Sequence, residues 1–192
     1  NYILDNQDIP IRDVFSHTLP GDPLTPHEWL SEVLFAIAHR LLGLDGAIIM
    51  TASIIAPSFW LVFQRSKKNR KSFVVLLCVG MLILLPSTIH WLSRPHIFTF
   101  LMLALWLIAI ENIINNKVRY WWVLPVIMVG WVNLHGAFSA GFVIWLLYAI
   151  GLIWDRVWFK RDENDLLPNK FWHYFLVGGI TSFLSSLINP VG

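Results

Sequence analysis

The chain has 192 residues, of which 56% are hydrophobic and only 14% are charged, including eleven Trp and thirteen Phe. Soluble domains carry about 25% charged residues, so this composition excludes an ordinary soluble domain and predicts a protein whose main solvent is lipid. The net charge is +2. Because no basic stripe exists outside one short loop, a nucleic-acid partner is also excluded.

The first 46 residues are polar and mostly acidic, with seven Asp and Glu residues against two Arg. Within them, one motif is typical of a helix start, because it offers an N-cap hydroxyl, a proline at the first helical position and a glutamate that reaches back: Thr25-Pro26-His27-Glu28. We expect an amphipathic surface helix over about residues 26–42, lying on the membrane with its acidic face toward water. A short buried span is the alternative.

Apolar runs occupy the rest of the chain, residues 47–192. Splitting one long run at a polar turn gives six helices of about the length that a bilayer requires. They cover about residues 47–63, 73–90, 97–114, 120–134, 136–154 and 171–188. The expected fold is therefore an all-α integral membrane protein with about six transmembrane helices plus an extracytoplasmic surface helix.

Lysine and arginine set the expected orientation. Eleven of the fourteen basic residues lie in the loops 64–72, 112–119 and 155–170, which alternate helices bring to one side. That side is predicted to be cytoplasmic. Residues 1–46 and the turns between the other helix ends are then extracytoplasmic.

Two carboxylates on the extracytoplasmic side could act as a base, Asp13 and Glu28. Each has a structural alternative: Asp13 could cap an ordinary turn, and Glu28 could belong only to a helix cap. Arg94 lies in a turn between two spans and could grip a phosphate with two parallel hydrogen bonds, or extend to lipid phosphates. His96 follows it in the same turn.

Asn133 and His135 interrupt an apolar run, and polar groups at that depth need partners or a polar cavity. The alternative is a polar contact between two helices. Asn189 ends the last apolar run and could be a plain helix terminator. No motif indicates a cofactor, and no histidine pair has the spacing of a helical zinc site, although the residues leave a divalent metal open.

The order of several short motifs resembles a group of bacterial polytopic membrane proteins classed as glycosyltransferase-like. They are similar to the C-type membrane glycosyltransferases, which include protein mannosyltransferases and lipid A aminoarabinose transferases. The matching motifs are Asp13-x-Phe15-Ser16-x-Thr18, Gly21, His27-Glu28-Trp29-Leu30-Ser31-Glu32, Gly43, Arg94-Pro95-His96, Trp131-x-Asn133-x-His135-Gly136 and Asn189-Pro190-x-Gly192.

The resemblance implies a polyprenyl-phosphate sugar as donor and a site between an extracytoplasmic loop and the membrane. It implies base or positioning work for Asp13 and Glu28, and substrate binding by Arg94, His96, Asn133, His135 and Asn189. The leading acidic motif of the family would precede Asn1. We therefore expect a fragment, truncated at both ends, that lacks the main catalytic acid motif.

The expected function is transfer of a sugar from a polyprenyl-phosphate donor to an extracytoplasmic acceptor, in the inner membrane of a bacterium. Membrane lipid is the other expected partner. A lipid or glycan transporter is the first alternative, although such proteins place polar residues near the bilayer midplane. A non-catalytic membrane assembly subunit is the second.

Overall fold

The computed structural model describes residues 1–18, 20–68, 73–115, 118–158 and 169–190. Across these ranges the chain is helical, and its only bridge between extended segments joins Arg12 to Pro23. Parts of the three expected cytoplasmic loops, and Gly192 of the last motif, lie outside the described residues. The expected all-α fold is confirmed for the part of the chain that the structure describes.

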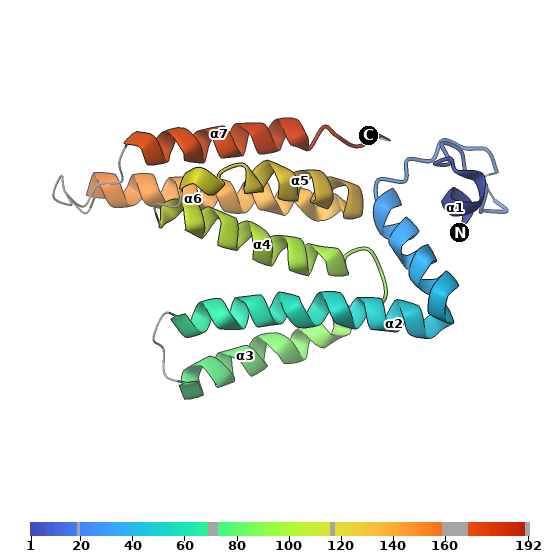
Figure 1. The fold of residues 1–192 in the computed structure, drawn as a ribbon, viewed down its shortest axis with the longest axis horizontal. Coiled ribbons are helices and arrows are strands. Elements are labelled where there is room, and N and C mark those ends of the chain that lie inside the picture. The colour runs from blue at the N-terminus through green and yellow to red at the C-terminus, as the bar shows by residue number, and fades with distance from the viewer. Residues whose placement is uncertain (19, 69–72, 116–117, 159–168, 191–192) are drawn as a thin grey trace.

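Seven α-helices and three short 3-10 helices make up the described chain (Figure 1). In chain order they are α1 (Tyr2–Asn6), α2 (Trp29–Lys68), α3 (Phe73–Ser87), η1 (Thr88–His90), α4 (Ile97–Ile114), η2 (Val118–Tyr120), α5 (Val123–Leu134), η3 (Gly136–Phe138), α6 (Ser139–Trp158) and α7 (Asn169–Ser185).

Three helical segments are long and apolar enough to cross a membrane: Trp29–Lys67, Ile97–Ile114 and Gly136–Trp158. Two shorter apolar segments, Val74–His90 and Val118–Leu134, fall on two more of the expected spans. Large apolar side chains on α3 and α6 are exposed, including Leu82, which is 72% exposed. An apolar surface of this extent is typical of a protein in lipid. That all six expected ranges cross the membrane stays a prediction.

Helix α2 is bent into two limbs at Gly43, whose φ of 63° and ψ of −145° are not helical. Glycine takes this left-handed backbone without the strain that a side chain would meet. The bend also brings Gly46 against the first limb, because a Cβ there would lie 2.0 Å from the carbonyl oxygen of Ala38. In Figure 1 the first limb crosses one end of the bundle, and the second limb runs along it.

The first limb begins at Trp29, three residues after the expected start at Pro26. The Trp29 amide donates to the Pro26 carbonyl in a tight turn, and Glu28 is the first residue whose carbonyl accepts an α-helical bond, from Glu32. Thr25 is therefore not the N-cap. Residues 27 and 28 form a turn before the helix, so Pro26 lies outside α2.

The helices pack side by side in the order α3, α2, α4, α5 and α7, with α6 against α4 and α7 (Figure 1). The main core lies between α4, α5, α6 and α7, around the fully buried Trp106, Trp131 and Phe175. A second core joins the first limb of α2 to α4 and α5, because Leu30 and Leu34 pack against a cluster that includes Phe98 and Leu134. This second core seats the first limb on the end of the bundle.

We call that end of the bundle the polar end and define it by residues 1–18 and 20–28, the turn Trp91–His96, the turn His135–Phe138 and Asn189 (Figure 1). The opposite end carries the end of α2, the end of α4 and the end of α6. There Arg65 of α2 forms an ion pair with Glu111 of α4. The alternation of helices thus brings the residues singled out by the sequence to one end.

Candidate functional site

A carboxylate and an imidazole meet at the polar end. Glu28 lies at the start of α2, and His135 lies in extended conformation directly after α5. Oε1 of Glu28 is 3.3 Å from Nε2 of His135, and the two side chains are 35% and 21% exposed. The pair is therefore partly shielded yet reachable from the surface.

Hydrogen bonds on the other side of the ring fix which nitrogen of His135 carries the proton. The amide of Ala137 donates to Nδ1 of His135, and the Thr99 hydroxyl lies 2.8 Å from the same atom. Trp131 in turn donates its indole N–H to the Thr99 oxygen. Nδ1 is therefore an acceptor in the neutral ring, so the proton is on Nε2, which faces Glu28.

The surroundings of His135 oppose a second proton on its ring. Partial burial lowers the pKa of His135 below the ordinary value of 6.5, the negative charge of Glu28 raises it, and His96 lowers it again, with a net lowering. A neutral imidazole that donates from Nε2 holds the Glu28 carboxylate in place. The resulting arrangement is an oriented, partly exposed carboxylate at the polar end.

Asn133 uses all of its side-chain donors on the protein itself. Its amide nitrogen donates to the carbonyls of Val129 and Ile188, both at 2.8 Å. Its carbonyl oxygen accepts the indole N–H of Trp29 at 2.7 Å. Asn133 is buried, so these bonds tie the start of α2 to the ends of α5 and α7. The geometry fits a positioning residue, since no donor remains for a substrate.

Asn189, the residue after Ile188, also donates two hydrogen bonds from its side-chain amide. Its amide nitrogen donates to the carbonyl of His27 at 3.2 Å and to that of Val132 at 3.1 Å. The bond to His27 fixes the backbone beside Glu28. Together with Asn133, it makes the position of the Glu28 segment depend on α5 and α7.

His96 lies close to the pair without contacting Glu28. Its Nε2 is 2.7 Å from the carbonyl of His90, and its ring centroid is 6.4 Å from that of His135. The proton of His96 is then on Nε2, as a donor to that carbonyl.

Asp13 and Arg94 are not drawn into the same cluster. The Asp13 carboxylate accepts the amides of Phe15 and Ser16, and hydrogen bonds from the Ser16 hydroxyl and these amides lower its pKa. In the structure, Asp13 therefore caps its own turn, which was the structural alternative to a role as a base. The Arg94 side chain is exposed and forms no hydrogen bond or ion pair with any described residue. Of the seven residues singled out, Glu28 and His96 each contact His135 directly. Asn133 and Asn189 bond instead to neighbouring segments of the polar end.

Three residues outside the set proposed from the sequence prove to organise the site: Trp29, Thr99 and Trp131. Thr99 lies three residues after His96, on the same helix face. It carries the one hydroxyl in an apolar run, and this feature of the sequence could have identified it as part of the site. Among the described residues, no group of three or more His, Cys, Asp or Glu side chains is placed to hold a metal ion.

Comparison with known proteins gives no match: no protein-family model, curated protein or solved structure matches this chain. The resemblance drawn from the order of its motifs therefore stays a prediction.

Proposed function

We propose that this chain is part of a membrane glycosyltransferase that moves a sugar from a polyprenyl-phosphate donor to an acceptor hydroxyl. The observation that carries the proposal is the contact between Glu28 and His135 at the polar end. One carboxylate oxygen is held by the imidazole. The other, Oε2, forms no hydrogen bond to the described residues and can accept a proton.

In the proposed reaction, Glu28 acts as general base. The acceptor oxygen attacks the anomeric carbon of the sugar and loses its proton to Oε2 of Glu28. The bond between that carbon and the phosphate oxygen breaks, and its electron pair leaves with the lipid phosphate. His135 keeps its proton and positions the base. Asn133, Asn189 and Thr99 hold the segments that carry the pair.

Arg94 is the proposed partner of the departing phosphate. It lies at the polar end, is exposed and has no acidic partner among the described residues, so its guanidinium is available to an anion. A planar guanidinium can place two parallel hydrogen bonds on a phosphate, which lysine cannot do. Charge developing on the leaving group would be stabilised there.

The distribution of polar groups supports chemistry at the membrane surface over transport. In the described residues, Asn133 and His135 at the polar end take part in several side-chain hydrogen bonds between different elements, whereas the main core holds one, from Trp106 to the Gly141 carbonyl. A transporter would place such groups near the bilayer midplane. We propose that the protein lies in the inner membrane of a bacterium with the polar end and the first limb of α2 outside the cytoplasm, because eleven of the fourteen basic residues belong to the loops that the sequence predicts to be cytoplasmic.

The test is transfer by the full-length protein in proteoliposomes. A labelled polyprenyl-phosphate sugar and an extract of cell-envelope acceptors are supplied, and labelled product is measured. Arg94→Lys is expected to raise KM for the donor although it keeps the charge, whereas Arg12→Lys, at the same end, is the control. Movement of the labelled lipid across the bilayer without transfer would contradict the proposal and favour a flippase.

A further inference from the structure

A hollow of about 200 Å³ lies between the second limb of α2 and α4, toward the end of the bundle opposite the polar end. Leu61 and Arg65 line it from α2, and Ala104, Ile108 and Glu111 line it from α4. A water molecule occupies about 30 Å³ in the liquid, so the hollow has room for a group of several heavy atoms. Its lining contains charged side chains of both signs.

The two charged side chains of this hollow form an ion pair. Arg65 pairs with Glu111, and their side chains are 27% and 29% exposed. Both residues belong to helices that are long and apolar enough to cross a membrane, and Glu111 is the one charged residue of α4. Each lies within one turn of the end of its helix, which in a spanning helix is the level of the lipid headgroups. Ionisable side chains in such segments are costly, and they often mark functional sites.

Neither member of the pair is saturated by the other. A guanidinium has five N–H donors and a carboxylate has two acceptor oxygens, and the ion pair joins Nη2 of Arg65 to Oε2 of Glu111. Within the part of the chain that the structure describes, neither side chain forms another hydrogen bond. The hollow therefore offers free cationic donors beside a free anionic acceptor.

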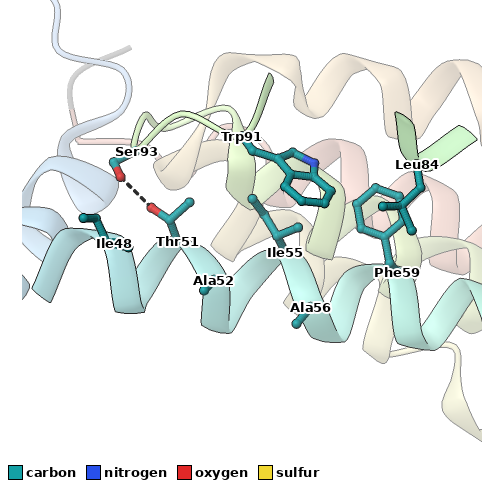
Figure 2. A pocket seen from close by; sticks show the side chains of 9 residues that line it. All are labelled: Ile48, Thr51, Ala52, Ile55, Ala56, Phe59, Leu84, Trp91 and Ser93. Atoms are coloured by element: carbon teal, nitrogen blue, oxygen red, sulfur yellow. Dashed lines mark hydrogen bonds between the residues drawn. The ribbon is translucent and has the colours of Figure 1, made fainter. Parts of the chain in front are cut away.

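The neighbouring hollow between α2 and α3 differs in this respect. Figure 2 shows its lining, in which none of the nine residues is charged. Its two hydroxyls belong to Thr51 and Ser93 and are hydrogen bonded to each other at 2.8 Å. That hollow has no charge with which to select a ligand, whereas the hollow between α2 and α4 has two.

We propose that the hollow between α2 and α4 binds the headgroup of phosphatidylethanolamine. The lipid phosphate accepts the free N–H donors of Arg65, and the primary ammonium donates to Glu111. A purely anionic headgroup would be attracted by Arg65 and repelled by Glu111, and a choline headgroup has no N–H to donate. A headgroup with a phosphate and an ammonium satisfies both side chains, while Leu61 and Ile108 meet the apolar part of the lipid.

The test measures lipid binding to the full-length protein in detergent. Phosphatidylethanolamine, phosphatidylcholine and phosphatidylglycerol with identical acyl chains are added in turn, and native mass spectrometry measures the lipid-bound fraction. The double variant Arg65→Gln with Glu111→Gln removes both charges, so that neither is left unpaired. Leu61→Trp fills the hollow and keeps the ion pair, because Leu61 lines this hollow and not those between α2 and α3. Val157→Trp is the matched control, at an exposed position near the same end of the bundle and outside this lining.

Wild type is expected to bind phosphatidylethanolamine about tenfold more tightly than phosphatidylcholine, the difference that one charge-assisted hydrogen bond makes. The double variant should lose this preference, and Leu61→Trp should weaken binding of phosphatidylethanolamine, whereas Val157→Trp should bind as wild type does. Equal binding of the three lipids by wild type would overturn the proposal, and so would an unchanged preference in the double variant. If the double variant does not fold, Leu61→Trp decides: wild-type affinity, or an equal loss in Val157→Trp, overturns the site. Sugar transfer does not enter the readout, so the result is independent of the proposed function.

Discussion

The Nε2 atom of His135 lies 3.3 Å from Oε1 of Glu28, so the turn after α5 directly contacts the start of α2. Behind the ring, Nδ1 accepts hydrogen bonds from the Ala137 amide and the Thr99 hydroxyl. The orientation of the carboxylate therefore depends on a residue of α4 that does not touch it.

Thr99→Val is expected to loosen this arrangement. The Trp131 indole loses its acceptor and Nδ1 of His135 loses a donor, which should lower the free energy of unfolding by about 1–3 kcal/mol. Thermal unfolding in detergent measures the change. Thr181→Val is the control, because the Thr181 hydroxyl donates only within its own helix, to Val177 and Gly178. An equal loss in both variants would show that the Thr99 bonds carry no special weight.

Stability should fall as the solution becomes acidic, because the pKa of His135 is lowered in the folded protein. The folded state then binds fewer protons than the unfolded state between the lowered pKa and the ordinary value of 6.5. The contribution of His135 is present above pH 6.5 and is lost as the pH falls through that window. Unfolding midpoints across the pH range, for wild type and His135→Gln, test this. His39→Gln is the control. If His135→Gln leaves the dependence of the unfolding midpoint on pH as it is in wild type, the prediction is wrong.

Gly46→Ala should disrupt the bend in α2. The added methyl would lie 2.0 Å from the carbonyl oxygen of Ala38 and 2.8 Å from its carbon, so the backbone itself must move. We expect a loss of roughly 1–3 kcal/mol in the free energy of unfolding, as for an overpacked core. Gly151→Ala is the control, because a methyl group added there on α6 would meet nothing within 4 Å. A Gly46→Ala protein as stable as wild type would mean that the two limbs do not pack this closely.

Topology can be measured by cysteine labelling in cells, with the exposed Cys78 first replaced by Ser. His17→Cys should react with an impermeant maleimide added outside. Lys67→Cys and Arg156→Cys should react only after permeabilisation, because both residues lie at the end of the bundle opposite the polar end, which the basic loops predict to be cytoplasmic. Reaction of Lys67→Cys in intact cells would reverse the orientation.

Much of the helical architecture could be predicted from the sequence, because runs of apolar residues and the breaks between them depend on local composition. The break at Gly43 was predictable for the same reason, since glycine permits a left-handed backbone. The start of α2 was misplaced at Pro26, because a capping motif shows a helix start without showing how many residues turn before it.

The pairing within the site was not predictable, because it depends on how the first limb of α2 rests on the bundle. Glu28 meets His135 because Leu30 and Leu34 pack against the cluster that includes Phe98 and Leu134, and because Asn133 and Asn189 bond to the residues beside Glu28. Alternation of helices placed Asp13 and Arg94 at the same end, yet it could not show that one caps its own turn and that the other is free of described partners.

The most direct test of the account is the rate of sugar transfer by Glu28→Gln full-length protein. The substitution keeps the size of the side chain and removes its ability to take a proton. If Glu28 is the base, kcat should fall about 10²–10⁴-fold, with little change in KM for the polyprenyl-phosphate sugar, whereas Glu32→Gln, one turn along the same limb, should transfer at close to the wild-type rate. A Glu28→Gln protein that transfers sugar as fast as wild type would contradict the account.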